Sequence, residues 1–459
     1  MKASQFTIAL IAGVVAGTAW VSLADAVTFR AGGSSAGTLF ATQVPLNLCT
    51  SVPGNLPSHY VNDGSQINAT GGTVTNGKLH VWRCSVPGFA GTTVFKYSAT
   101  GSSDGVIKLN NASENFNCST AGNPTLNNNC MTMLPDLPSS SNCTPTGSNP
   151  QTRPSDGKQF NEFSCSDTGV FETLNVGTAD VAGSSFGQQG PITTTVNPLD
   201  QSALISTQVA IVPFDIVVGN DVGRVDAGGF LQPLDNLTRT EVEGLLSGNV
   251  SDWRQLGLAT GTVGTSTLDT TSPVVLCMRK AGSGTKAALD QTVLKDAKES
   301  PLCSTNLTGS GTKFCGQSTQ DVRDCIDGNS GQGISAHPTG IGYMDADASE
   351  LLTGGHRVKL NGAWSHDAAG ATEAERKKDL RCGRYLYWVG ERFNTRNPSS
   401  ADPTLASLIG QYITNAASPA TISLLPAGDF WDAPESLFVS KANDPGPVLW
   451  KAGPHTACN

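Results

Sequence analysis

Apolar and polar residues alternate along most of the chain in short runs, and turns rich in glycine and serine separate these runs. The range 27–109 contains the succession of strand, turn and amphipathic continuation twice. Val- and Ile-containing runs at 209–220 and 274–279 are typical of buried strands. Thr238 is predicted to cap a helix, with Glu241 at the capping-box position. The recurrence of strand, Gly-rich turn and helix predicts an α/β sheet with helices on its faces.

One stretch departs from this pattern. Residues 110–168 are dense in Asn, Ser, Thr, Pro and Gly, show little periodicity, and contain four cysteines, which are Cys118, Cys130, Cys143 and Cys165. We interpret the stretch as a surface insertion that disulfides hold in place. A second cysteine-rich patch contains Cys303, Cys315 and Cys325.

The first residues are predicted to be a secretory signal peptide. Lys2 gives a positive start, an apolar run covers 6–23, and Ala24-Asp25-Ala26 fits a cleavage site after Ala26. No cysteine stands at that point, so no lipoprotein attachment is expected, and the mature chain shows no second long apolar segment. We therefore expect a periplasmic or secreted chain that begins near Val27 and has no membrane span.

Composition narrows the classes further. About 430 residues remain after cleavage, enough for two to three domains. Twelve cysteines in an exported chain favour disulfides, with open connectivity, whereas scattered histidines and the absence of C-x-x-C pairs argue against zinc. The net charge of −9 excludes a generally basic nucleic-acid surface. An anion site would have to work through locally aimed donors. We expect no cofactor and no metal.

Candidate chemistry centres on RKAGSGTK, residues 279–286. Arg279 can offer a two-pronged guanidinium, and the glycines let the backbone approach a ligand at the start of a helix. Ser283 and Thr285 add hydroxyl donors. This pattern predicts an oxyanion seat, although Ser and Thr also cap ordinary helices, and that plainer interpretation stays open at this point.

Other motifs carry less weight. GSSFG at 183–187 fits the nucleophile-elbow pattern with Ser185 as nucleophile, but no histidine can be assigned as its base. AGSGTK lacks the ending of a P-loop. Tyr385, Tyr387 and Trp388 alternate as in a strand and are interpreted as packing residues.

Five blocks in order resemble the phosphate-binding branch of the type II periplasmic binding proteins, which serve ABC transporters. The first three are RAGGSSAGTLF, YSATGSSDGVIKL and VGTADVAGSSF, the last with Ala179 where the family usually has Ser. The others are LTRTEVEGLLSGNVSDWRQL and the pair RKAGSGT with GQGISAHPTGIGYMDADA. Together they span roughly residues 29–348.

The resemblance implies two α/β lobes with a ligand clamped between them and two crossover strands, near Pro213–Val218 and Gly340–Tyr343. Hinge closure around the ligand is the motion expected of such a fold. The implied division of the chain is 1–26 signal peptide, 27–212 first part of lobe 1 with the cysteine-rich insertion, 213–343 lobe 2, and 344–459 second part of lobe 1 and C-terminal region.

The resemblance also places the family's phosphate contacts on Ser35, the amide of Ala36, Ser102, Asp180, Arg279, Ser283, Gly284 and Thr285. Asp180 would select the ion, because a carboxylate repels an anion that has no proton to share. Hydrogen phosphate carries such a proton and sulfate does not. Taken alone, Asp180 would instead read as a surface turn residue or a helix cap.

The leading hypothesis is an exported binding protein, not an enzyme, that captures inorganic phosphate or a related protonated oxyanion such as arsenate. Delivery to the permease of an ABC importer is implied by the resemblance alone. The alternative is a secreted or surface-associated protein that uses the same fold and its disulfide-rich insertions for adhesion, assembly or partner binding. A phosphatase is disfavoured, because the predicted site has donors but no nucleophile–base pair or metal.

Overall fold

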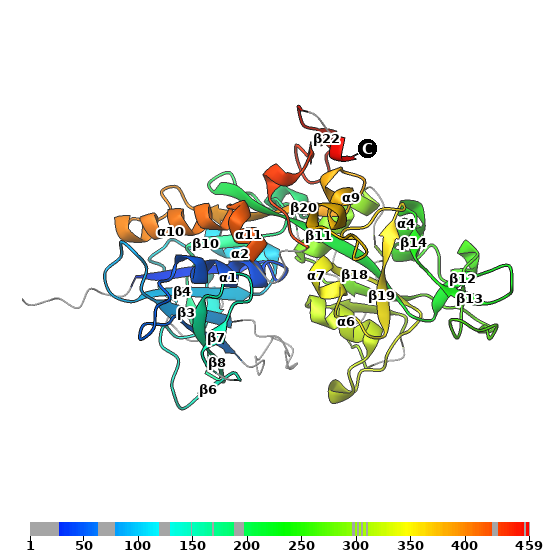
Figure 1. Ribbon diagram of the computed structural model, residues 1–459, viewed down its shortest axis with the longest axis horizontal. Coiled ribbons are helices and arrows are strands. Elements are labelled where there is room, and N and C mark those ends of the chain that lie inside the picture. The colour runs from blue at the N-terminus through cyan, green and yellow to red at the C-terminus, as the bar shows by residue number, and fades with distance from the viewer. Residues whose placement is uncertain are drawn as a thin grey trace, which may run out of the picture.

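The computed structural model has two lobes of mixed helix and strand, with two strands running between them (Figure 1). It describes residues 27–62, 79–118, 129–147, 149–167, 169–187, 197–295, 299–300, 303, 306–308, 311–424, 430–453 and 456–458. The predicted signal peptide at 1–26 lies outside the described residues. Within the described ranges, no helix has the length and apolar character needed to cross a bilayer. The predicted α/β fold class is confirmed.

The first lobe is built around β1 (Thr28–Gly33), which pairs in parallel with β4 (Thr93–Ala99) and β10 (Val176–Ala179). All residues of β4 and β10 are buried, as expected for strands covered on both faces. The sheet continues beyond β4 through β3 (Leu79–Cys84), β2 (Ser58–Asn62), β8 (Gln159–Cys165), β6 (Cys143–Pro145) and β7 (Gln151–Thr152). The helices of this lobe are α1 (Thr38–Leu48), α2 (Ser102–Asn111), α10 (Pro403–Ala416) and α11 (Pro419–Leu424).

The cysteine-rich insertion is more regular than its sequence indicates. Its strand β8 pairs in parallel with β2 and so extends the sheet of the first lobe, while β5 (Met131–Met133) pairs with β9 (Val170–Glu172). Disulfides Cys118–Cys130 and Cys143–Cys165 lie within it, as predicted. The strand escapes prediction because most residues of β8 are only partly buried, which leaves little apolar alternation in the sequence.

In the second lobe, β16 (Val275–Arg279) lies in parallel between β17 (Lys313–Gly316) and β18 (Gly340–Asp345). The other strands are β19 (Gly355–Leu360), β14 (Asn236–Leu237), β12 (Val222–Val225), β13 (Leu231–Pro233) and β15 (Ala259–Thr260). The helices are α4 (Arg239–Leu246), α5 (Gly284–Leu289), α6 (Thr319–Asp327) and α7 (Ala346–Ser349). The predicted capping box of Thr238 and Glu241 is confirmed at the start of α4.

Two antiparallel strands connect the lobes. The first half of β11 (Ile205–Gly219) pairs with β20 (Trp388–Thr395), and its second half pairs with β18 and β19. Strand β20 also pairs with β10 of the first lobe. The first predicted crossover, 213–218, lies in β11. Residues 340–343 lie in β18, which pairs with strands of the second lobe, so the second connecting strand is β20 instead. The chain reaches β20 after α8 (Glu373–Arg376) and α9 (Lys378–Arg381). The division into domains stays a prediction.

Six disulfides use all twelve cysteines. Besides the two in the insertion they are Cys49–Cys84, Cys277–Cys325, Cys303–Cys315 and Cys382–Cys458. The last of these joins the C-terminal segment, which contains η5 (Pro434–Ser436), β21 (Val439–Ser440), β22 (Leu449–Trp450) and η6 (Thr456–Cys458), to the chain just before β20. This segment is therefore held against the junction of the lobes.

Candidate functional site

The first-lobe half of the predicted site lies where β1, β4 and β10 end. Ser35 and Ala36 follow β1, Ser102 opens α2 after β4, and Asp180 follows β10 directly. Because parallel strands end at one edge of their sheet, these turns meet there. Ser34 donates its hydroxyl to the Asp180 carboxylate, and the Asp180 amide donates to Ser102 Oγ over 3.4 Å.

The second-lobe half is the turn between β16 and α5. Gly282 has a φ of +84°, in the left-handed region that favours glycine, and this lets the chain turn sharply after Arg279. Ser283 caps α5 by accepting a hydrogen bond from the amide of Lys286 at 3.3 Å. The plainer interpretation of this motif, a capped helix, is thus correct for Ser283, and it leaves Arg279 and Thr285 to be explained.

Arg279 is buried within a polar network. Its Nη1 donates to Thr319 Oγ1 at 2.9 Å and to Thr285 Oγ1 at 3.3 Å, and its backbone amide donates to the Tyr343 hydroxyl at 3.0 Å. Both threonine hydroxyls in turn donate to Asp345, at 2.8 Å from Thr319 and 3.2 Å from Thr285. Residues of the second lobe therefore fix the orientation of the guanidinium.

The two halves touch each other across the junction. Arg279 Nη2 lies 3.4 Å from Ser35 Oγ, to which it donates. The amide of Ser103 donates to the Gly282 carbonyl at 3.2 Å. These contacts bring residues that lie far apart in the sequence into one cluster.

Gly284 shows how close the approach is. A Cβ at this position would overlap with Asp180 Oδ2 and Ser102 Oγ of the other lobe, so the contact requires glycine. We call Ser35, Ser102, Asp180, Arg279, Gly284 and Thr285 the interlobe cluster. The remaining two predicted residues are buried beside it: Ala36 follows Ser35, and Ser283 precedes Gly284.

The arrangement of two α/β lobes around such a cluster agrees with a comparison of the sequence with known families. A family profile described as PBP superfamily domain matches residues 64–380. The chain belongs to the PBP superfamily. The resemblance to periplasmic binding proteins predicted from the sequence is thereby confirmed. No curated protein matches the chain.

Several solved structures are similar to this PBP-superfamily chain at low identity. A phosphate-binding protein from Stenotrophomonas maltophilia is 14% identical over 86% of this chain and 84% of its own, with a TM-score of 0.37. PstS from Borrelia burgdorferi is 11% identical over 89% and 98%, with a TM-score of 0.36. An ABC-type phosphate transport receptor from Vibrio cholerae is 13% identical over 57% and 80%, with a TM-score of 0.34. Similarity at this level does not transfer a ligand to this chain.

Two buried carboxyl groups near the cluster were missed by the sequence analysis. Glu391, on β20, faces the turn after β1, since a Cβ on Gly37 would lie 2.8 Å from Glu391 Oε1. Asp345, at the end of β18, accepts the two threonine hydroxyls described above. The signal for Glu391 was present as an acid in the otherwise strand-like and apolar run YLYWVGERF.

Burial controls the ionisation of these acids. Burial raises the pKa of Asp180, against hydrogen bonds from Ser34 and Ser102 and the charge of Arg279, which lower it. Burial, followed by the negative charge of Asp180, raises the pKa of Glu391 well above its usual value. Burial also raises the pKa of Asp345 to about 6, although Arg279 opposes this. The cluster thus places one guanidinium close to buried carboxyl groups whose pKa values burial raises.

Three further groups of residues are accounted for by their surroundings. Ser185, the candidate nucleophile, donates its hydroxyl to the carboxylate of Asp444 at 2.5 Å. Its hydrogen-bond partner is therefore a carboxylate and not a histidine base. In the described part of the chain, one group with metal-ligand spacing consists of Cys143, Cys165 and Asp167, but the two cysteines form a disulfide and offer no thiolate. Tyr385, Tyr387 and Trp388 are buried, which confirms their predicted packing role.

Proposed function

We propose that this chain binds inorganic phosphate between its lobes, at the interlobe cluster, as an exported solute-binding protein that supplies an ABC importer. The observation that carries the proposal is the position of Asp180, which is 1% exposed, accepts a hydrogen bond from Ser34 of the first lobe and lies against Gly284 of the second lobe. Membership of the PBP superfamily supports a solute-binding role. The phosphate ligand, its contacts and the delivery to a permease are the proposed part.

The donor set suits a dehydrated oxyanion. Burying an anion costs several kcal/mol or more unless its oxygens receive hydrogen bonds. Arg279 supplies a charged fork, and the hydroxyls and turn amides of both lobes supply neutral donors. The donors proposed to contact phosphate are the hydroxyls of Ser35, Ser102, Ser283 and Thr285, the amides of Ala36 and Gly284, and the guanidinium of Arg279. Thr285 would turn its hydroxyl proton from Asp345 to the phosphate.

Asp180 is proposed to select the ion, and Glu391 is proposed to keep Asp180 ionised by holding the proton of the pair. Two adjacent buried carboxyl groups do not both ionise readily, and the proton of such a pair stays on the group with the higher pKa. Because burial and Asp180 raise the pKa of Glu391 well above its usual value, Glu391 keeps its proton and Asp180 can remain an acceptor. An acceptor can bind hydrogen phosphate, which has a proton to donate, and it repels sulfate.

Calorimetric titration of the purified mature protein with phosphate and then with sulfate tests the function. We expect phosphate to bind and sulfate to be rejected by a factor of roughly 10⁴, because the wrong ion leaves a buried acceptor unpaired. The variant Asp180→Asn should bind sulfate far better, since its amide no longer repels it. Glu162→Gln, a change in the strand β8 of the insertion, is a control that should leave the selectivity intact.

Two results would contradict the proposal. If neither phosphate nor arsenate produces heat, the chain does not bind this class of ion. If phosphate binds but Asp180→Asn leaves the rejection of sulfate unchanged, the role given to Asp180 is wrong. Export is tested separately by N-terminal sequencing of the protein recovered outside the cytoplasm, for which a chain that begins at Val27 is expected.

A further inference from the structure

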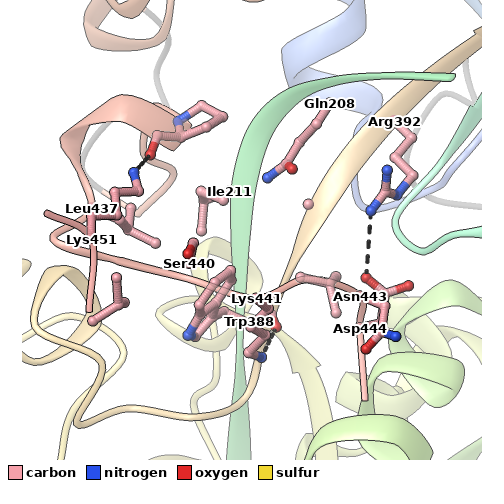
Figure 2. Close-up of a pocket in the computed structure, with 14 residues that line it drawn as sticks. Gln208, Ile211, Trp388, Arg392, Leu437, Ser440, Lys441, Asn443, Asp444 and Lys451 are labelled. Atoms are coloured by element: carbon pink, nitrogen blue, oxygen red, sulfur yellow. Dashed lines mark hydrogen bonds and ion pairs between the residues drawn. The ribbon is translucent and has the colours of Figure 1, made fainter. Parts of the chain in front are cut away.

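A cavity of about 240 Å³ lies at the junction of the lobes, away from the interlobe cluster. Strands β11 and β20 form one wall, and the C-terminal segment around β21 forms the other (Figure 2). We call it the junction cavity. Among the described residues, the disulfide Cys382–Cys458 anchors its second wall.

A β-bulge shapes the first wall. The register between β11 and β20 shifts between Gln208 and Ala210, so that Gln208 lies opposite Arg392 while Ile211 lies opposite Gly390. Residues directly opposite in an antiparallel pair share a face of the sheet, and a bulge re-aims side chains. Polar Gln208 and apolar Ile211 therefore both line the cavity.

The balance of charged side chains in the cavity differs from that of the interlobe cluster, because basic residues outnumber acids. Its lining includes the three cations Arg392, Lys441 and Lys451 and the single acid Asp444. Asp444 is already engaged, since it accepts hydrogen bonds from the Ala182 amide at 2.8 Å and from a serine hydroxyl. Arg392 Nη2 forms a loose ion pair with Asp444 Oδ1 at 3.9 Å, a distance too long for a hydrogen bond. Among the residues that the structure describes, the buried Arg392 Nε has no hydrogen-bond partner.

Besides the polar residues Ser440 and Asn443, much of the remaining lining is apolar. Trp388, Ile211 and Leu437 are each at most 3% exposed and belong to one small core cluster. Lys441 Nζ lies 4.0 Å from the centre of the Trp388 ring and donates to two backbone carbonyls. Burial lowers the pKa of Lys441 to about 7, so a negative charge nearby would favour its protonated form.

We propose that the junction cavity binds a small organic anion, with its carboxylate at Arg392 and Gln208 and an apolar ring or chain against Ile211 and Trp388. The carboxylate would provide a hydrogen-bond acceptor for Arg392 Nε. Apolar walls with a few convergent polar groups are the usual composition of small-molecule sites. An inorganic anion would leave the apolar walls unused. This site does not depend on phosphate binding at the interlobe cluster.

Titration of the mature protein with benzoate, and with benzamide as an uncharged analogue, tests the proposal. We expect benzoate to bind with a Kd of about 1 mM or lower, and benzamide about tenfold or more weakly, because a charge-assisted hydrogen bond is lost. Arg392→Met should weaken benzoate binding by about tenfold. If this variant fails to fold, Ser440→Trp, at an exposed lining position, should block the cavity instead.

Ala442→Trp places the same bulk on an exposed neighbour outside the lining and is the matched control, which should still bind benzoate. Absence of saturable benzoate binding would overturn the proposal. Equal binding of benzoate and benzamide would do so as well, because the charge would then play no part. Benzoate binding that survives Ser440→Trp would place the ligand elsewhere.

Discussion

The interlobe cluster and the junction cavity lie on opposite sides of the same strand. Along β20, Glu391 faces the cluster, whereas its neighbours Gly390 and Arg392 line the cavity. The cluster holds one buried guanidinium close to buried carboxyl groups, while the cavity holds three basic side chains and one acid that already accepts hydrogen bonds. The alternation of side chains along one strand thus separates two different electrostatic environments.

The two proposals describe two ways of recognising an anion in a chain whose net charge is −9. In the cluster, Arg279 is the cation that attracts an anion, and Asp180 is proposed to act as a hydrogen-bond acceptor. The proposed ligand must therefore carry a proton of its own. In the cavity, cations attract and apolar walls select for an organic body. The proposals thus assign selectivity for a protonated ligand to the first region, and selectivity for shape and charge to the second.

The variant Arg279→Gln tests most directly whether the two regions bind their ligands independently. Removing the only cation of the interlobe cluster should weaken phosphate binding by a hundredfold or more, since charge-assisted bonds are lost and the Asp345 side is left without its counter-charge. Benzoate affinity should stay within about twofold, because the cavity uses other cations. Both affinities are read from calorimetry on the same preparation. A parallel loss of both would mean that the regions are not independent.

The dependence of stability on pH should have opposite signs in the two regions. Asp345 has a raised pKa of about 6, so the folded state binds more protons than the unfolded state between about pH 4 and pH 6, and stability falls as pH rises through that window. Lys441 has a lowered pKa of about 7, so the unfolded state binds more protons from about pH 7 to pH 10.5, and stability rises there.

Urea unfolding at a series of pH values measures both parts of the stability profile, the acidic limb between about pH 4 and pH 6 and the alkaline limb from about pH 7 to pH 10.5. Each group contributes at most about 1.4 kcal/mol per pH unit. Asp345→Asn should reduce the acidic limb and leave the alkaline one, and Lys441→Met should do the reverse. If neither variant alters its own limb, burial does not control these groups as described.

The smallest expected effect is coupling between the regions. Asp444 connects the cavity to the turn after Asp180, because its carboxylate accepts a hydrogen bond from the Ala182 amide. An anion at Arg392 would compete with Asp444 for the guanidinium and should lower phosphate affinity by about fivefold, the low end for coupled sites. Phosphate titrations with and without saturating benzoate measure it. An unchanged affinity would show that the turn does not respond to the cavity.

The sequence predicted residues in turns better than residues in strands. Ser35, Ser102 and Asp180 were named through the family resemblance of their Gly- and Ser-rich turns, and Arg279 through its own motif. The structure brings these four residues together, and their contact with phosphate stays a prediction. Glu391 was missed, since its proximity to Asp180 depends on the pairing of β20 with β10, which no local pattern encodes. The junction cavity was equally hidden, because its second wall comes from a segment that reaches the junction only through tertiary packing.

The pairing of β20 with β10 also bears on how the chain folds. Strand β10 is synthesised in the first half of the chain, but the strand that covers its outer edge begins only at Trp388. Until then, the nascent first lobe exposes an unpaired edge of apolar sheet, the type of edge that invites association with other chains. The first lobe therefore cannot complete its sheet before nearly the whole polypeptide has been made, and these non-local pairings are expected to slow folding. A polypeptide that ends at residue 212 should aggregate rather than fold as a separate domain.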